Sequence, residues 1–125
     1  MSKLPDVIRN YISAYNNFDI ADMLACLSDD IEFKNITNGE VNTHTHSKAE
    51  FETLANMGVS AFKSRTQTVT RSMTVSHITL IDIDYEAVVA TDLPNGWKAG
   101  QELSFSGASA FELRGDKIMR IIDQS

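Results

Sequence analysis

The sequence predicts an α+β fold in which a curved antiparallel sheet of about six strands, two of them an N-terminal hairpin, wraps around three helices as a cone-shaped half-barrel. Two observations predict it. Three segments in the first half of the chain carry apolar residues at helical spacing, and residues 65–124 are rich in Thr, Val and Ile with few breakers. Because long antiparallel strands coil around whatever covers their inner face, we expect the cone to enclose a cavity.

Two helices in hairpin order open the chain. Pro5 suits the first turn of a helix. The apolar residues that follow recur on one helical face: Val7, Ile8, Tyr11, Ile12 and Tyr15. After Asn16 and Asn17 end this helix, Asp19 is a good N-cap for a second, short one. The apolar stripe of the second helix consists of Ile20, Met23, Leu24 and Leu27.

A β-hairpin and a third helix come next. From Ile31 the apolar pattern changes to a period of two, which indicates a half-buried strand. Asn38-Gly39 is a strong hairpin signal because both residues tolerate positive φ, so residues 40–43 should return as a short partner strand. Ser47 with Glu50 forms a capping box, and the helix that it starts should run for about four turns.

Four antiparallel strands fill the rest of the chain. We expect them at about 65–76, 78–93, 101–114 and 117–124, with a turn near His77 and breaks at Pro94-Asn95-Gly96 and Gly115-Asp116. Gly107, inside the third of these strands, predicts a bulge or bend. A polar stripe on the first of them predicts a flat outer face of the sheet: Thr66, Thr68, Thr70, Ser72 and Thr74.

Composition limits the function classes. The 125 residues fit one domain, 1–125, and 11 basic against 17 acidic residues give a net charge of −6. An acidic protein repels phosphate backbones and anionic lipids, so we expect no nucleic acid partner. No stretch approaches the length of a membrane span, and the N-terminus lacks the order of a signal peptide. Cys26 is the only cysteine, so no internal disulfide can form, which fits a cytoplasmic protein.

A family pattern runs through nearly the whole chain. It consists of Val7-Ile8 with Tyr11, Asn17 to Asp19, Leu27 before Asp29-Asp30, Ile31 with Phe33, and Phe111 before Gly115-Asp116-Lys117-Ile118. In this order and spacing the sequence resembles the nuclear transport factor 2-like superfamily, and within it the SnoaL-like and ketosteroid isomerase-like proteins. The resemblance implies a cystatin-like cone, and framework residues of this kind imply fold more than function.

The resemblance also suggests candidate catalytic residues. In the steroid isomerase branch, a carboxylate moves a proton while a tyrosine and a protonated carboxyl group stabilise the dienolate oxygen. Tyr11 occupies the place of that tyrosine, Asn35 the place of the base and Ser109 the place of the second oxygen donor. Because a carboxamide has no useful basicity near neutral pH, standard ketosteroid isomerisation is not expected. Asp123 or His46 would then be the proton acceptor.

Each candidate also has a structural interpretation. Tyr11 on an amphipathic helix is typical of a core residue whose hydroxyl reaches water, and Asn35 is compatible with a satisfied structural hydrogen bond. Asp123 lies two positions from the C-terminus, where a solvated residue is the ordinary outcome. His44 and His46 share a face but lack a third ligand, so no metal site is expected.

We expect the cone to receive a small hydrophobic, polyketide- or steroid-like molecule. Further ligand contacts would be Tyr15, His46, Trp97 and Phe111. An enzyme of this group would use acid–base chemistry without a cofactor, for isomerisation, cyclisation, dehydration or hydrolysis. The alternative is a non-catalytic ligand-binding or protein-interaction module, since the superfamily includes both. The family commonly pairs its sheet faces, so we also expect a homodimer through the outer face.

Overall fold

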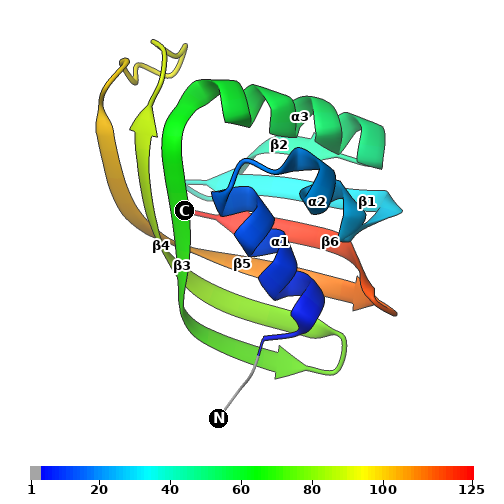
Figure 1. Cartoon of the computed structure of the whole chain (residues 1–125). Helices are drawn as coiled ribbons and strands as arrows, with labels where there is room; N and C mark the ends of the chain where they lie inside the picture. Colours follow the sequence, from blue (N-terminus) through cyan, green and yellow to red (C-terminus); the bar gives the residue numbers. More distant parts are fainter. Residues whose placement is uncertain (1–3) are drawn as a thin grey trace.

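A computed structural model describes residues 4–125 of the protein (Figure 1). Its helices are α1 (Asp6–Asn16), α2 (Ile20–Ala25) and α3 (Lys48–Ala61). Its strands are β1 (Leu27–Thr37), β2 (Glu40–Thr45), β3 (Phe62–Val75), β4 (Ile78–Val89), β5 (Glu102–Arg114) and β6 (Lys117–Gln124). The predicted α+β class and the predicted order of helices and strands are confirmed.

One six-stranded sheet carries the fold, with the strand order β2-β1-β6-β5-β4-β3. Neighbouring strands are antiparallel except β1 and β6, which run parallel. The sheet curves around the helices, with α1 lying against its concave side and α3 across its upper end (Figure 1). The parallel pair places the C-terminal strand beside β1, so residues far apart in the sequence meet inside the cone.

Local signals set the helix starts and the first hairpin. The Asp19 carboxylate accepts a hydrogen bond from the Asp22 backbone at the start of α2. The Ser47 hydroxyl accepts one from the Glu50 backbone at the start of α3. Asn38 and Gly39 have φ angles of 53° and 79°, the left-handed values that a two-residue hairpin turn requires. These predicted caps and this turn are confirmed.

Helix α1 is tied to β3 by one side chain. The Asn16 amide donates to the Gln67 carbonyl over 3.1 Å and accepts from the Gln67 N–H over 2.8 Å. The side chain therefore pairs with this edge strand as a neighbouring strand would, and it satisfies backbone groups that would otherwise lack partners. This link fixes the C-terminal end of α1 against the sheet.

The apolar core lies between the helices and the concave face of the sheet. Its most deeply buried members come from α1, α2 and four strands: Ile8, Met23, Leu27, Ile31, Ile81, Phe111, Ile118 and Ile121. Burial of each such side chain contributes roughly 1.5–3 kcal/mol to stability. This core fixes the backbone that carries the polar side chains beside it.

The predicted polar stripe of β3 changes face part-way along the strand. An irregularity between Val69 and Arg71 leaves Thr70 as an extra residue, so the alternation shifts by one. Thr66, Thr68 and Thr70 stay on the outer side, whereas Ser72 and Thr74 turn inward, opposite Ile81 and Thr79. The expectation of one continuous polar face is wrong, because a bulge cannot be placed from the sequence pattern alone.

Gly107 does not form the expected bulge. Strand β5 keeps its register with β4 through this position. A Cβ atom at Gly107 would lie 2.9 Å from the Gln124 carbonyl oxygen, which is closer than real Cβ atoms approach. The glycine is therefore needed where the backbone of the last strand passes close to β5.

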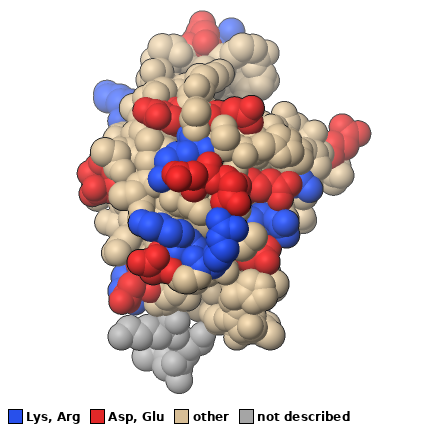
Figure 2. All heavy atoms as spheres, turned by 90° about the vertical axis from the view of Figure 1, so that its right-hand side faces the viewer, with Lys and Arg blue, Asp and Glu red and all other residues tan. Residues whose placement is uncertain are grey.

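Charged side chains of both signs are mixed on the surface. Figure 2 shows basic and acidic groups interspersed on one face, with no large area of a single sign. Several are paired, such as Arg114 with Asp30 at 2.6 Å and Arg120 with Glu32 at 2.8 Å. Among residues 4–125, no helix combines the length and apolar character that crossing a membrane requires.

Candidate functional site

Two adjoining cavities lie on the concave side of the sheet. The helix-side cavity has a volume of about 420 Å³ and the strand-side cavity about 580 Å³, both within the range of small-molecule sites. The helix-side cavity is lined, among others, by Tyr11, Phe51, Leu54 and Arg65. The strand-side cavity is lined, among others, by Tyr85, Trp97, Phe105 and Ser109. Both cavities touch Tyr15, Asn35, Phe62 and Asp123, so they meet at these side chains.

Three polar residues lie in a row across adjacent strands at this meeting point. Asn35 on β1 is the register partner of Asp123 on β6, and Asp123 is the partner of Ser109 on β5. The Ser109 hydroxyl donates a hydrogen bond of 2.6 Å to Asp123 Oδ1. The parallel pairing of β1 with β6 creates this row and brings a residue near the C-terminus into the cone.

Asp123 is a carboxyl group held away from bulk water. Burial disfavours its charged form and raises its pKa to about 6, while the hydrogen bond from Ser109 acts in the opposite direction. Such a carboxyl is mostly ionised at neutral pH and still accepts a proton readily, which suits a general base. Asp123 is therefore not the solvated terminal residue that its position in the sequence suggests.

Tyr11 projects from α1 to the wall of the helix-side cavity. It is buried, and its ring packs edge-on against Phe111 with 6.0 Å between the centroids. None of the side-chain hydrogen bonds found within residues 4–125 involves its hydroxyl. Burial, followed by the charge of Asp123, holds the pKa of Tyr11 well above its ordinary value of 10.0. The hydroxyl therefore stays protonated and remains free to donate.

Asn35 makes a structural hydrogen bond and also lines the cavities. Its Nδ2 donates to Asn42 Oδ1 over 3.1 Å, as the structural interpretation expects. The same side chain lines both cavities beside Asp123. Its Oδ1 has no partner among the side chains of residues 4–125, so an acceptor is left for a ligand.

Tyr15 and Trp97, two of the predicted ligand contacts, lie at cavity walls. The Tyr15 hydroxyl shares a 3.0 Å hydrogen bond with the Tyr85 hydroxyl, and burial raises the pKa of Tyr85 far above its ordinary value. Trp97, in the loop after β4, lies 6.3 Å from Phe62 between ring centroids. Both residues are thus placed to cover an apolar ligand.

Phe111 and His46, the other two predicted ligand contacts, lie elsewhere. Phe111 is 2% exposed and belongs to the filled core, and it is absent from the walls of both cavities. His46 is exposed and follows β2, with its ring 4.1 Å from that of His44. Phe111 lies on the same face of β5 as Ser109, but the Tyr11 ring packs against it there and fills the space. His46 is exposed beside His44 and lines neither cavity.

His44 and His46 do acquire a third possible metal ligand. Their ring nitrogens and the Glu32 carboxylate lie within 4.8 Å of one another. Glu32 could not be identified as a possible ligand from the sequence, because the register of the β1–β2 pair is not readable there. Both Glu32 oxygens are already engaged, one with His44 Nε2 and one with Arg120 Nε, each at 2.8 Å. The Glu32 carboxylate is therefore already satisfied by His44 and Arg120.

Arg65 and Tyr85 line the cavities, and sequence reasoning missed them as site residues. Tyr85 continues the buried alternation of Ile81 and Ile83 on β4, and that signal was available. Arg65 occupies an inward position of β3, two residues before Gln67, and Thr66 between them takes the outer side. An arginine at an inward strand position is the signal that could have found it.

The family of the chain follows from its sequence. The model of the SnoaL-like domain matches residues 8–121. The chain belongs to the SnoaL-like family. The resemblance to the nuclear transport factor 2-like superfamily is thereby confirmed, and ketosteroid isomerase-like structural neighbours agree with it. No curated protein matches this SnoaL-like protein in sequence.

Solved structures share the fold of this SnoaL-like protein at low identity. A protein from Catenulispora acidiphila with a ketosteroid isomerase-like fold, in complex with trimethylamine, is 12% identical over 97% of this chain and 85% of its own, with a TM-score of 0.80. A putative polyketide cyclase from Pseudomonas putida is 19% identical over 98% and 91%, with a TM-score of 0.75. An LEH-like epoxide hydrolase from M. tuberculosis is 15% identical over 96% and 80%, with a TM-score of 0.77. At these identities the likeness establishes the cone fold.

Proposed function

We propose that this SnoaL-like protein binds a small hydrophobic, polyketide- or steroid-like carbonyl compound in the helix-side cavity and moves a proton on it without a cofactor. The observation that carries the proposal is Asp123, a carboxylate on the cavity wall whose pKa is raised to about 6. Cyclisation, isomerisation and dehydration of such compounds can all start with removal of a proton next to a carbonyl group. The likeness to a putative polyketide cyclase supports this substrate class.

In the proposed reaction, Asp123 takes the proton as the carbon–hydrogen bond of the substrate breaks. The electron pair moves to the carbonyl oxygen, and the Tyr11 hydroxyl donates a hydrogen bond to the oxyanion that develops there. Ser109 orients the Asp123 carboxylate through the 2.6 Å hydrogen bond. The protonated Asp123 then returns the proton to another carbon in an isomerisation, or to a leaving oxygen in a dehydration.

Binding without turnover is the second candidate function, and Asn35 favours it. The resemblance to ketosteroid isomerases puts the base at this position, where the chain has an amide. Together, Asn35 Oδ1 and the Tyr11 hydroxyl offer an acceptor and a donor, a set that fits recognition of a ligand hydroxyl or carbonyl.

Hydrogen exchange on a ketone separates the two candidates. We expect the protein to accelerate deuterium uptake at the α-carbon of 1-tetralone in D2O, followed by NMR. Asp123→Asn should lower this rate by roughly 100- to 10,000-fold, since an amide cannot accept the proton. Asp84→Asn, at an exposed position of β4, is the matched control and should keep the rate. Binding of the ketone with no exchange above buffer would favour the non-catalytic function.

We also propose that a second copy of the chain covers the outer face of the sheet. Four large apolar side chains there are 40–68% exposed: Met73, Val75, Ile78 and Leu80. The register continues this patch across the sheet, from Leu80 to Ala110 and on to Ile122. A contiguous apolar patch of this kind marks an interaction surface, and a homodimer through the sheet face satisfies it.

A further inference from the structure

One arginine of this protein is buried at the cavity wall. Arg65 on β3 is 4% exposed and lines the helix-side cavity with Tyr11 and Asp123. Its Nε donates to the Tyr15 carbonyl over 3.0 Å, and its Nη2 is buried without a hydrogen-bond partner. A buried guanidinium with an unused nitrogen costs free energy, because buried charges are ordinarily paired and hydrogen-bonded.

The other arginines show the opposite arrangement. Their side chains are 43–84% exposed, and each is paired with a carboxylate: Arg9 with Asp6, Arg71 with Asp82, Arg114 with Asp30 and Arg120 with Glu32. Arg65 makes no ion pair within residues 4–125, although Asp123 lines the same cavity. The one arginine that water does not solvate is the one without a counter-charge.

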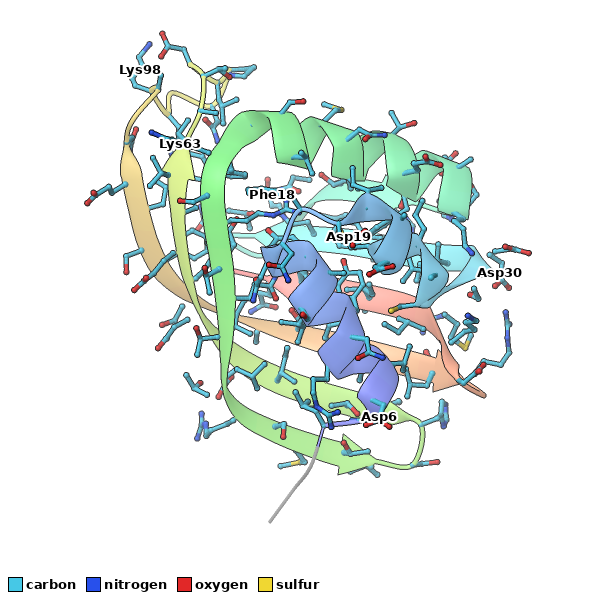
Figure 3. All side chains as sticks on the ribbon, in the orientation of Figure 1. Asp6, Phe18, Asp19, Asp30, Lys63 and Lys98 are labelled. Carbon is cyan, nitrogen blue, oxygen red and sulfur yellow. The ribbon has the colours of Figure 1, made fainter. Side chains whose placement is uncertain are left out.

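Aromatic rings and a glycine hold the guanidinium in place. Its central carbon lies 3.7 Å from the centre of the Tyr15 ring and 4.8 Å from that of Phe18. Phe18, in the loop between α1 and α2 (Figure 3), has a φ of 57°, which is unusual for a bulky residue. A Cβ atom at Gly58 on α3 would lie 3.2 Å from Nη1. The guanidinium is therefore positioned by α1, the following loop and α3.

We infer that Arg65 binds an anionic oxygen group of the ligand, so that the substrate class is a hydrophobic carboxylic acid. The Arg65 Nε is already bonded to the Tyr15 carbonyl, so the two terminal nitrogens, Nη1 and Nη2, remain as donors. Together they can donate one hydrogen bond each to the two oxygens of a carboxylate. The apolar part of the acid would lie against the cavity wall beside Phe51 and Leu54. This inference rests on the proposed function only in taking the helix-side cavity as the ligand site, and it requires no proton transfer.

Two probes of nearly the same shape test the inference. 2-Naphthoate and 2-naphthamide differ in charge, and their affinities are measured by calorimetry. We expect the natural protein to bind the naphthoate about tenfold tighter than the amide. Arg65→Met should abolish this preference. Arg71→Met, which removes an exposed arginine paired with Asp82, should retain it. Replacing a buried unpaired cation by an apolar chain of similar length should preserve folding, which thermal melting checks.

Gly58→Ala is a second variant, and it leaves the charge of Arg65 in place. Its new methyl group would crowd Nη1, so naphthoate affinity should fall severalfold with little change for the amide. Equal affinities for the two probes in the natural protein, or a preference that survives Arg65→Met, would overturn the inference. Failure of both probes to bind would overturn it together with the proposed ligand site. A retained naphthoate preference without ketone exchange supports it and contradicts only the proposed catalysis.

Discussion

A network of side-chain contacts joins charged residues on the outer face of the sheet, whereas Asp123 and Arg65 on the concave face make no ion pair within residues 4–125. On the outer side a chain of side-chain contacts of 2.8–3.1 Å runs through His44, Glu32, Arg120, Glu112 and His77. On the concave side, Asp123 accepts one hydrogen bond and Arg65 has no counter-charge. The outer chain is satisfied within the protein, and the proposed function assigns the two inner charges to a ligand.

Two serine residues of β5 each donate a hydrogen bond to an aspartate, one on each face of the sheet. Ser109 donates to Asp123 over 2.6 Å on the concave side, and Ser106 donates to Asp84 over 3.2 Å where both residues are exposed. The chemical groups are the same, but burial raises the pKa of Asp123 to about 6. Because the hydrogen bond from Ser109 acts to lower this pKa, the raised value comes from the buried environment of Asp123 and not from its serine partner.

The largest effect should come from Asp123→Asn, measured as stability against pH. The pKa of Asp123 is about 6 in the folded protein and near 3.8 in the unfolded chain, so the folded state binds more protons between these values. The contribution of Asp123 to the free energy of unfolding therefore falls by about 2 kcal/mol as pH rises from 4 to 7. The asparagine variant has no carboxyl at this position and lacks this decrease. Its free energy of unfolding, measured by urea unfolding at each pH, should therefore rise by the same amount relative to that of the natural protein between pH 4 and 7.

Asp84→Asn is the matched control for this measurement. Asp84 is exposed, so water and salt screen its charge, and its replacement should change stability by less than about 0.5 kcal/mol across the range. A constant difference between Asp123→Asn and the natural protein from pH 4 to 7 would mean that Asp123 is solvated. The contrast between the two faces would then be lost.

Much of the fold could be predicted because its signals are local. The Asp19 and Ser47 caps and the Asn38-Gly39 turn each depend on residues within a few positions of one another. The bulge at Thr70 could not be predicted in this way, since it depends on how β3 pairs with β4 over many residues. One extra residue in a strand moves every later side chain to the other face.

The candidate site could be predicted from the sequence only in part. The family resemblance pointed to Tyr11, Asn35 and Ser109, which the fold does bring to or beside the two cavities. The position of Asp123 beside Asn35 depends on the parallel pairing of β1 with β6. This is a long-range contact, and no local signal in the sequence predicts it. The unpaired state of Arg65 is likewise visible only once every nearby carboxylate has been placed.

Ser109→Ala should have a smaller effect, directed at the same carboxylate. The hydroxyl stabilises the charged form of Asp123, so its removal should raise the pKa of Asp123 by about one unit above its value of about 6. NMR titration of the Asp123 carboxyl carbon measures this shift directly. Ser106→Ala, the exposed counterpart, should leave that titration unchanged. An unaltered Asp123 titration in Ser109→Ala would show that the 2.6 Å hydrogen bond does not stabilise the carboxylate.

A substitution on the outer face of the sheet should have the smallest effect on ligand binding in the cavities. Leu80→Glu places a charge in the middle of the outer apolar patch, which also contains Met73 and Val75. We expect sedimentation at micromolar concentration to show the natural protein at twice its 13.9 kDa and the variant at that single mass. Thr68→Glu, on the outer side but outside the patch, should stay dimeric. Since Leu80 lines neither cavity, naphthoate binding should persist in the monomer, and its loss would show that the two faces are coupled.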